Sequence, residues 1–442
     1  MKKAGVAMLS AAMMISAAFA GYLGTSVSDI NTYAAYESKY TLSNSDANEI
    51  TSKVYDYLCD SFGNTILAGQ QESTWMGSVD YEMNYIENNT GKLPAIRGLD
   101  FMGGDFDGVV KRSKDWWEKG GIVTICWHTG VNGGSYNDSL NDSPNFSKLL
   151  TKGTSEYNAM IANWDKAAEA LKELRDAGVP VLWRPFHEFD GQWFWWGKGG
   201  SSNFVKLWQM MYDYFTDVHG LDNLIWVLGY ADSVTNGWYP GDEYCDIIGS
   251  DTYNNSNLTH KNAWTKLNNM NTDMPIAFHE CGNLPTVEAL KSDGCMWSWF
   301  MVWHTSHITN NNKTNLNNLY NSELITTLDE LPDFATYNDK EDENSSSENS
   351  IDNDSSSMSE SNSDIESSSE IDSINDSNED SSSKIDNINT SSQAATTSSS
   401  LASTNPNKTN SDRSPNTGIA FSLSTLAITA SALVVIKKKN DK

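Results

Sequence analysis

Eight short apolar runs recur along the chain, and they limit its possible folds more than any other feature. They occupy residues 65–69, 95–101, 122–128, 179–188, 224–230, 245–253, 275–280 and 296–304. The runs are continuous, whereas a strand with one wet face alternates apolar and polar residues. Continuous runs of this length are typical of strands that are covered on both faces. The sequence therefore predicts eight buried strands.

Helical segments lie between several of these predicted strands. Residues 157–177 carry apolar side chains at helical spacing, and Gly178 and Pro180 then end the helix. Further helices are expected over 203–215 and 113–119. Strands that alternate with helices predict an α/β fold, namely a (β/α)8 TIM barrel. A doubly wound open sheet is the alternative, but no GxGxxG phosphate loop follows any of the runs.

The N-terminal end differs from the predicted barrel domain, which spans 45–335. The first residues combine a basic start with an apolar stretch, and Ala18, Phe19 and Ala20 supply a small-residue cleavage pattern. These features are typical of a secretory signal peptide, here residues 1–20. Residues 21–44 are expected to form a linker to the barrel. The sequence thus predicts that the protein is secreted.

A polar, acidic segment follows the predicted barrel over residues 336–413. Ser, Asn, Asp and Glu dominate it, and 339–386 hold sixteen acidic residues against two lysines. About half of the formal net charge of −28 lies there. A segment of this composition cannot bury a core, so we expect a disordered stalk. The net charge of the chain therefore says little about what the barrel binds. The sequence contains no basic patch interleaved with aromatic residues, so a nucleic-acid partner is not expected.

The C-terminal residues 414–442 combine three features in a fixed order. The pentapeptide SPNTG stands at 414–418, an apolar run of spanning length follows at 419–436, and three lysines come next. An apolar run of this length that is followed by basic residues stays embedded in the membrane, with its lysines in the cytoplasm. The order resembles the sorting signal of Gram-positive surface proteins, although Ser414 replaces the usual Leu. The resemblance implies cleavage by sortase between Thr and Gly and attachment to peptidoglycan; a plain membrane anchor is the alternative.

The cysteines argue against a disulfide scaffold or a structural zinc site. There are five of them, an odd number, and no CxxC occurs. One bridge between Cys281 and Cys295 stays open. A metal-dependent barrel hydrolase is a further alternative, because the chain has seven histidines. Such barrels often carry an HxH pair on the first strand, but Gly69, Gln70 and Gln71 stand there, so no metal or cofactor is expected.

Polar residues end several of the predicted strands, where a closed apolar layer would not accept them. These residues are Asp100, His128, Arg184, His187, Glu188, Tyr253, Glu280 and His304. In a barrel of this type the active site lies at the carboxyl ends of the strands. The sequence therefore predicts that these side chains meet at one polar mouth.

The stretch 181–197 suggests what this mouth does. It places Glu188 five residues before four consecutive aromatic residues, 193–196. Indole faces match the apolar faces of pyranose rings, and a carboxyl beside them loses water and keeps its proton. Glycosidic cleavage uses two carboxyl groups, one protonated and one ionised. Glu188 is the candidate proton donor, and Glu280 is the candidate nucleophile. Core packing of the aromatic run is the alternative, although four consecutive side chains cannot all face one interior.

Several motifs resemble glycoside hydrolase family 26, whose members are clan A barrels and mostly endo-β-1,4-mannanases. The run WRPFHE at 183–188, followed by GQWFWWG at 191–197, looks like the signature of that family. The resemblance continues at LAGQ 67–70, PAIRG 94–98, WH 127–128, YPGD 239–242, DTY 251–253, ECG 280–282 and VW 302–303. It spans the whole predicted barrel.

The resemblance implies a retaining double displacement. Glu188 is then the acid/base and Glu280 the nucleophile, to which Tyr253 donates a hydrogen bond. His187 stands next to the acid, and Trp303 forms the floor of the subsite for the attacked sugar.

Other residues are expected to contact the substrate. His128 and Trp193 match substrate-contacting positions of the family, and we expect Asp100, Arg184 and Trp196 in the same site. Arg184 either orients Glu280 or pairs with Asp100. Outer subsites or loop packing both remain open for Trp75, Trp238 and Tyr239. The tryptophans expected in the core on helices are Trp116, Trp117, Trp164 and Trp208.

The expected activity is endo-hydrolysis of β-1,4-linked mannan, glucomannan or galactomannan by a monomeric protein of a Gram-positive-type cell wall. Mixed-linkage β-glucan or xylan is the alternative substrate. These polymers differ at the 2-hydroxyl of the attacked sugar, which is axial in mannose. A surface protein that binds carbohydrate without cleaving it is the third possibility, and the presence of both acids argues against it.

Overall fold

The computed structural model describes residues 36–253, 258–270 and 273–339. The chain divides into two units, Met1–Ser350 and Ile351–Lys442, and every described residue belongs to the first. The predicted signal peptide, most of the predicted linker, nearly all of the stalk and the sorting region lie outside the described residues. Within the described ranges, no helix is both long and apolar enough to cross a membrane.

Eight parallel strands form a closed sheet. They are β1 (Ile66–Gln71), β2 (Ile96–Asp100), β3 (Ile122–Cys126), β4 (Val181–Arg184), β5 (Leu224–Ala231), β6 (Ile247–Thr252), β7 (Ile276–Cys281) and β8 (Trp299–Val302). Strand β1 pairs with both β2 and β8, and this pairing closes the barrel. The short strand β9 (Ile325–Thr326) pairs with the start of β1. The predicted (β/α)8 barrel is confirmed, and the open-sheet alternative is wrong.

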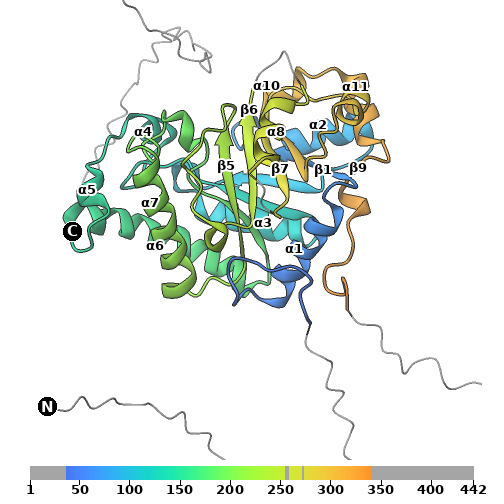
Figure 1. Cartoon of the computed structure of the whole chain (residues 1–442). Coiled ribbons are helices and arrows are strands. Elements are labelled where there is room, and N and C mark those ends of the chain that lie inside the picture. The colour runs from blue at the N-terminus through green and yellow to red at the C-terminus, as the bar shows by residue number, and fades with distance from the viewer. Residues whose placement is uncertain (1–35, 254–257, 271–272, 340–442) are drawn as a thin grey trace, which may run out of the picture. The chain divides into compact units, whose positions relative to one another are not determined.

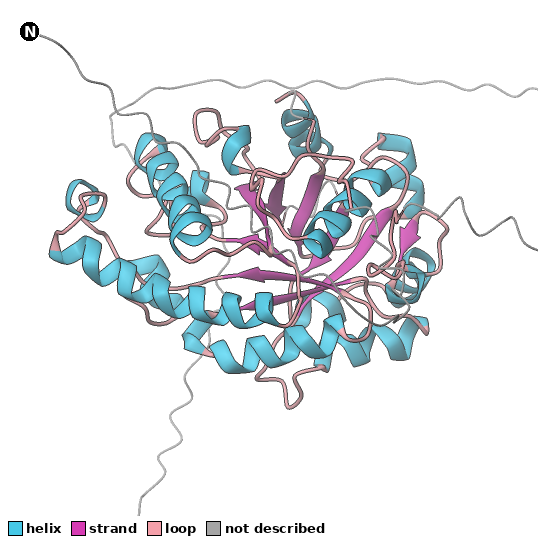
Figure 2. Ribbon diagram, turned by 90° about the horizontal axis from the view of Figure 1, so that it is seen from below, coloured by secondary structure: helices cyan, strands magenta, loops and turns pink. Residues whose placement is uncertain are grey.

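Helices surround the strands (Figures 1 and 2). They are α1 (Glu49–Ser61), α2 (Tyr81–Thr90), α3 (Phe106–Trp117), α4 (Tyr136–Asn141), α5 (Phe146–Leu149), α6 (Ser155–Asp176), α7 (Ser201–Asp213), α8 (Lys261–Asn268), α9 (Val287–Asp293), α10 (Ser306–Thr309) and α11 (Lys313–Tyr320). Four 3-10 helices are described, η1 (Met102–Gly104), η2 (Phe189–Gly191), η4 (Asp242–Tyr244) and η5 (Leu328–Glu330), and η3 (Tyr214–Val218) is a π-helix.

Local sequence explains where the main helices begin and end. Thr154 caps α6, because its side chain accepts a hydrogen bond from the amide of Tyr157. Gly178 follows α6 with a φ of 70°, a backbone conformation that glycine adopts without strain. Helix α3 begins at Phe106, earlier than expected, since Gly108 has low helix propensity and obscured the first turn in the sequence.

Helix α1 closes the amino-terminal end of the barrel. Val54 and Leu58 of α1 belong to one buried cluster with strand side chains, among them Leu67, Leu182 and Ile225. A larger buried cluster packs the strands against the surrounding helices. Apolar side chains therefore fill the amino-terminal end of the barrel, and polar residues occupy the carboxyl ends of the strands.

Both ends of the described domain bind α1. Asp56 on α1 accepts hydrogen bonds from the Tyr36 hydroxyl at 2.5 Å and the Lys39 amide at 2.8 Å. The buried Lys53 donates to the Ala335 carbonyl at 2.9 Å and pairs with Asp339 at 2.5 Å. The first and last described residues thus meet at the amino-terminal end of the barrel.

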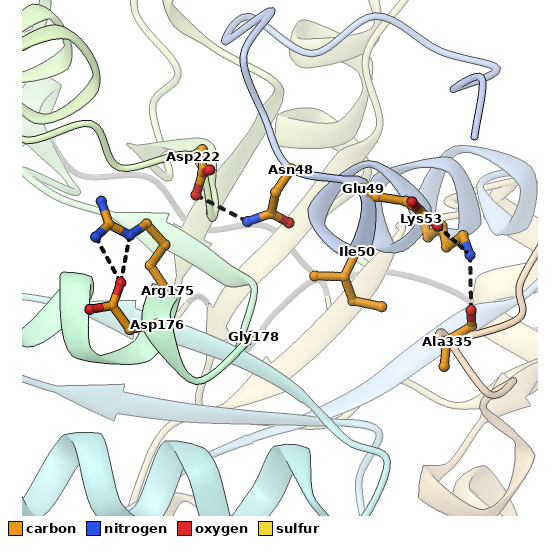
Figure 3. Close-up of a pocket in the computed structure, with 9 residues that line it drawn as sticks. All are labelled: Asn48, Glu49, Ile50, Lys53, Arg175, Asp176, Gly178, Asp222 and Ala335. Atoms are coloured by element: carbon orange, nitrogen blue, oxygen red, sulfur yellow. Dashed lines mark hydrogen bonds and ion pairs between the residues drawn. The ribbon is translucent and has the colours of Figure 1, made fainter. Parts of the chain in front are cut away.

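A cavity of about 550 Å³ lies beside α1, and Figure 3 shows its lining. Gly178 and Asp222 of the lining precede β4 and β5, so the cavity is at the same end of the barrel as α1. Its polar groups pair with one another. Asn48 donates to Asp222 at 3.1 Å, Lys53 binds Glu49 at 2.9 Å, and Arg175 binds Asp176 at 2.7 Å.

The cysteines form no bridge within the described chain, which includes all five of them. Cys126, Cys245, Cys281 and Cys295 are buried as free thiols, and Cys59 is partly buried. The Cys281–Cys295 bridge that the sequence left open is therefore not formed.

Candidate active site

The polar residues singled out in the sequence follow the carboxyl ends of the strands. Asp100 ends β2, Arg184 ends β4 and Glu280 is next to last in β7. His128 follows β3 by two residues, and Tyr253 follows β6 directly. Because all strands are parallel, these side chains lie at one end of the barrel, opposite α1.

Two groups, Arg184 and Tyr253, hold the carboxylate of Glu280. Arg184 donates from Nη2 to Oε1 of Glu280 at 2.5 Å and from Nη1 to Oδ2 of Asp251 at 2.7 Å. The Tyr253 hydroxyl donates to Oε2 of Glu280 at 2.7 Å. Arg184 thus orients Glu280, one of the two alternatives left by the sequence, and does not pair with Asp100. Charge-assisted hydrogen bonds of this kind favour the ionised carboxylate.

Asp251 belongs to this network, although sequence reasoning did not select it. It is fully buried between Arg184 and His279, and burial raises its pKa to about 6. Its position could have identified it. Asp251 lies in the same DTY motif as Tyr253, at the end of β6.

A bulge in β7 shapes the surroundings of Glu280. Ser250 pairs with Phe278 and Asp251 pairs with Glu280, so His279 is an extra residue between two paired positions. His279 faces the barrel interior, where Cβ atoms added at Gly229 and Gly249 would lie 3.2 and 2.4 Å from its ring. A bulge breaks the alternation of side chains along a strand. It therefore lets His279 and Glu280 both face the interior.

His279 lies next to Asp251 in this network. Its Nδ1 lies 3.3 Å from Oδ1 of Asp251, and its ring is fully buried. Burial, together with the nearby charge of Arg184, lowers the pKa of His279 well below its ordinary value. A neutral imidazole therefore stands behind the aspartate.

Glu188 lies in a tight turn after β4. Phe186 and Glu188 have φ angles of 52° and 53°, which residues other than glycine rarely adopt. The amide of Glu188 donates to the Gly229 carbonyl at 2.7 Å and holds this turn on β5. Backbone strain of this kind is often found where a side chain must be aimed at a ligand.

The surroundings of Glu188 favour its protonated form. Burial raises its pKa well above the ordinary value, and the charge of Glu280 raises it further. One hydrogen bond opposes this shift, from Trp193 Nε1 to Oε2 of Glu188 at 2.7 Å. Burial also raises the pKa of Glu280, and Asp251 adds to that shift, while Arg184 works against it. The pKa of Glu188 is thus raised further than that of Glu280, which suits Glu188 as a proton donor and Glu280 as a carboxylate.

A row of hydrogen bonds connects Asp100 with two histidines. Asp100 Oδ2 lies 2.6 Å from His128 Nδ1, and His128 Nε2 lies 3.0 Å from His187 Nε2. Burial lowers the pKa of His187 well below the usual value, so its ring is neutral. His187 Nε2 is also 3.9 Å from Oε1 of Glu280. The row therefore ends beside the candidate nucleophile.

The aromatic run divides between the site and the core. Trp193 is partly exposed beside Glu188, whereas Phe194, Trp195 and Trp196 are buried. Trp196 was expected to contact substrate, and this expectation is wrong. Its ring is 0% exposed, and its Nε1 donates to the His187 carbonyl at 2.7 Å. Trp196 therefore holds the backbone next to the acid.

Tyr136 was not selected from the sequence, yet it lies over the site. It is 41% exposed, and its ring centroid is 5.1 Å from that of His128 and 6.1 Å from that of Phe194. Nothing distinguishes this tyrosine in the sequence, where it begins α4 just after the glycine-rich residues 130–134. Only folding brings it to the mouth.

The remaining tryptophans are distributed as follows. Trp303 follows β8, and its amide donates to the Cys281 carbonyl at 2.9 Å. Of the three aromatic residues left open, Trp238 is buried and Tyr239 partly buried, but Trp75 is exposed. Of the tryptophans expected in the core on helices, three are buried: Trp116, Trp164 and Trp208. The fourth, Trp117, is only partly buried.

Two groups of potential metal ligands occur among the described residues. One is Asp100, Cys126 and His128, and the other is His187, Asp251 and Glu280. In the first group Asp100 already binds His128, and burial raises the pKa of the Cys126 thiol. In the second group the guanidinium of Arg184 binds both carboxylates. Arg184 thus supplies the positive charge that these acids need.

Taken together, the geometry suits the cleavage of an acetal. One partly buried carboxyl group favours its protonated form, and one carboxylate is aimed by an arginine and a tyrosine. The partly exposed indole ring of Trp193 stands beside the first. This pairing of an acid with a nucleophile is the arrangement that glycoside hydrolysis uses.

Comparisons with known proteins agree with this chemistry. The sequence profile of Glycosyl hydrolase family 26 matches residues 43–330. A mannan endo-1,4-beta-mannosidase of Thermothelomyces thermophilus is 34% identical over 314 residues, which are 66% of this chain and 63% of that protein. Mannan endo-1,4-beta-mannosidase B of a Piromyces species is 31% identical over 314 residues, 66% of this chain and 54% of that protein.

A solved structure shows the same fold. The GH26-CBM35 beta-(1,4)-mannanase of Podospora anserina superposes with a TM-score of 0.60 at 33% identity, over 66% of this chain and 69% of that chain. The matched part spans less than two thirds of the length of both curated relatives. The family profile nevertheless extends over all eight barrel strands and both candidate acids. This chain therefore belongs to glycosyl hydrolase family 26.

Proposed function

We propose that the barrel is an endo-acting, retaining hydrolase of β-1,4-mannosidic linkages in mannan, glucomannan or galactomannan. The observation that carries this proposal is the paired environment of the two acids. Burial keeps a proton on Glu188, while Arg184 and Tyr253 hold Glu280 as a carboxylate. The names of the relatives, mannan endo-1,4-beta-mannosidases, support mannan as the substrate.

The reaction has two displacements. In the first, the Glu280 carboxylate attacks C1 of the sugar, and Glu188 gives its proton to the leaving glycosidic oxygen. The C1–O bond breaks, and an ester joins the sugar to Glu280. In the second, the Glu188 carboxylate takes a proton from water, whose oxygen attacks C1 and frees Glu280. Both acids return to their starting states, and the anomeric configuration is retained.

The neighbouring residues serve these steps. Arg184 and Tyr253 keep Glu280 ionised and aimed, and they stabilise it again as a leaving group. Trp193 donates to Glu188 and stabilises its carboxylate in the second step. His128, whose two ring nitrogens are held by Asp100 and His187, presents a fixed ring to the sugar, and Trp303 lies under the attacked sugar.

Hydrolysis of three polymers tests this proposal. Release of reducing ends is measured on β-mannan, mixed-linkage β-glucan and xylan, because these polymers differ at the 2-hydroxyl of the attacked sugar. We expect mannan to be the best substrate. Glu188→Ala and Glu280→Ala should each lose several orders of magnitude in turnover. Glu243→Ala, which removes an exposed acid on η4, is the matched control and should behave as wild type.

Two results would reject the proposal. A clear preference for β-glucan or xylan would reject mannan as the substrate while keeping the mechanism. Turnover like that of wild type in either glutamate variant would reject the assignment of the acids.

We also propose that the protein is secreted and held at the bacterial cell wall. The signal-peptide pattern in 1–20 and the sorting pattern in 414–442 support this. Deleting residues 414–442 should release the active enzyme into the medium. An equal amount in the wall fraction with and without this segment would contradict the proposal.

A further inference from the structure

An exposed apolar patch lies on the loop between β1 and α2. Trp75, Met76 and Val79 of this loop are 54%, 41% and 40% exposed. Only two other large apolar side chains of the described residues are as open to solvent, Tyr136 and Val218. A tryptophan usually buries most of its surface, and clustered exposed apolar residues often mark a binding site.

Aromatic rings connect Trp75 with the catalytic centre. The ring centroid of Trp75 lies 4.8 Å from that of His304, and His304 lies 4.9 Å from Trp303. Trp303 is 6.1 Å from His128, which in turn is 5.1 Å from Tyr136. The row crosses the mouth of the barrel, and its two end members are the exposed ones.

The loop that carries Trp75 is fixed at both ends by buried charges. Glu72 accepts from Arg97 at 2.7 Å and from Arg112 at 2.7 Å. Arg97 also donates to the Val79 carbonyl at 2.7 Å and to Asp80 at 2.7 Å. An exposed side chain on a fixed loop loses little entropy on binding a ligand.

A single buried carboxylate joins the Trp75 loop to the His304 loop. Glu82 is fully buried and accepts from the Ser73 amide at 3.0 Å, the Ser73 hydroxyl at 2.6 Å and the Thr305 amide at 2.8 Å. Thr305, the residue after His304, has a φ of 56°, which is rare for a β-branched residue. The contact with Glu82 helps to hold this strained backbone.

We propose that Trp75, with His304 at its edge, forms a distal subsite that stacks a β-linked pyranose unit on the glycone side of the scissile bond. This inference rests on the proposed function. The assignment of this subsite to the glycone side follows from the positions of the strands. Glu188, which protonates the leaving oxygen, follows β4, whereas Trp303, His304 and Trp75 follow β8 and β1 on the opposite side of the closed sheet.

The chemistry of the pair suits a sugar. Trp75 presents an apolar face, which matches the C–H face of a pyranose ring. Burial lowers the pKa of His304 to about 4, so its ring is neutral at pH 7 and offers a hydrogen bond without adding charge. Its Nδ1 lies 3.3 Å from the Thr305 hydroxyl, which fixes the ring.

Cleavage of oligosaccharides of increasing length tests the subsite. The kcat/KM of wild type, Trp75→Ala, Trp75→Phe and Val218→Ala is measured from mannotriose to mannohexaose, with the products identified by mass spectrometry. Trp75→Ala should lower kcat/KM on mannohexaose by roughly tenfold, leave mannotriose unchanged and shift the cleavage positions. Trp75→Phe keeps a ring and should recover most of the loss. Val218→Ala, which shortens an exposed apolar side chain on η3, is the matched control and should equal wild type.

Two outcomes would overturn the subsite. One is a Trp75→Ala enzyme that equals wild type at every length. The other is the same loss at every length, which would mean that Trp75 only supports the fold. If wild type cleaved no manno-oligosaccharide, the proposed function would fail instead. The same length series made from mixed-linkage β-glucan would then decide the role of Trp75.

Discussion

At the scale of single residues, opposing effects set the protonation of Glu188. Burial and the charge of Glu280 raise its pKa, whereas the hydrogen bond from Trp193 lowers it. In the proposed mechanism Glu188 is protonated before the first displacement, so activity should fall as the pH rises through this pKa. The alkaline limb of the pH profile therefore reports the environment of one carboxyl group.

Replacing Trp193 with Phe tests this balance. The variant keeps an aromatic ring but removes the indole N–H that favours the Glu188 carboxylate. The pKa of Glu188 should rise, and the alkaline limb of kcat/KM should move to higher pH. Turnover should fall by roughly tenfold, because the carboxylate of the second step loses a hydrogen bond. An alkaline limb that moves to lower pH would contradict this account.

The sequence predicted where the candidate site residues lie in the fold better than their exposure. Glu188, Glu280, Arg184 and Tyr253 lie at or just after the carboxyl ends of strands, and parallel strands bring these ends together. Trp196 was misjudged, because the sequence does not show that the turn at Glu188 folds the following aromatic residues back into the core. The positive φ angles of that turn depend on contacts with β5, which are distant in the sequence.

At the scale of elements, the bulge in β7 positions the candidate nucleophile. Gly249 of β6 leaves the space that His279 occupies, since an added Cβ would lie 2.2 Å from the Ala277 carbonyl and 2.4 Å from His279. Strand periodicity alone would have placed His279 and Glu280 on opposite faces. The bulge could not be predicted because it arises from pairing with β6.

Adding a methyl group at Gly249 tests the importance of this space. Gly249→Ala should lower the free energy of unfolding by about 1–3 kcal/mol and reduce kcat, since His279 and Glu280 must move. Gly229→Ala is the graded control, because its Cβ would approach His279 only to 3.2 Å. Its effect on chemical denaturation should be smaller. A Gly229 variant that is the less stable of the two would contradict this explanation.

Asp246, which precedes β6, joins the segment around Ser43 to the barrel. Its carboxylate accepts from the amides of Ser43 and Trp226, both at 2.6 Å. Burial raises its pKa to about 6 from the ordinary 3.8. The folded state therefore binds this proton more tightly than the unfolded state, and the group costs stability as the pH rises from about 4 to about 6.

Asp246→Asn should separate the charge from the hydrogen bonds. The variant loses one acceptor and should be less stable than wild type at pH 4. It carries no charge, so it avoids the cost that wild type acquires at higher pH. The difference in Tm between the two proteins should therefore shrink between pH 4 and pH 7. A difference that grows with pH would show that burial of this charge is not costly.

At the scale of the whole molecule, the candidate acids and the two ends of the described chain lie at opposite ends of the barrel. The candidate acids lie at the carboxyl ends of the strands, while α1 binds both ends of the described chain at the other. The eight buried strands of the barrel were predictable from the sequence, because a continuous apolar run must be covered on both faces. The closure by α1 was not, since its packing against strand residues depends on contacts that are distant in the sequence.

The covalent intermediate offers the most direct test of the central claim, that Glu280 is the nucleophile and Glu188 the acid/base. A 2-deoxy-2-fluoro-mannosyl fluoride slows both displacements but has a leaving group that needs no acid, so the ester should accumulate. Mass spectrometry of the digested protein should find the sugar on the peptide that contains Glu280, in wild type and in Glu188→Ala alike. A label on Glu188, or an unlabelled Glu280 peptide in both proteins, would contradict the account.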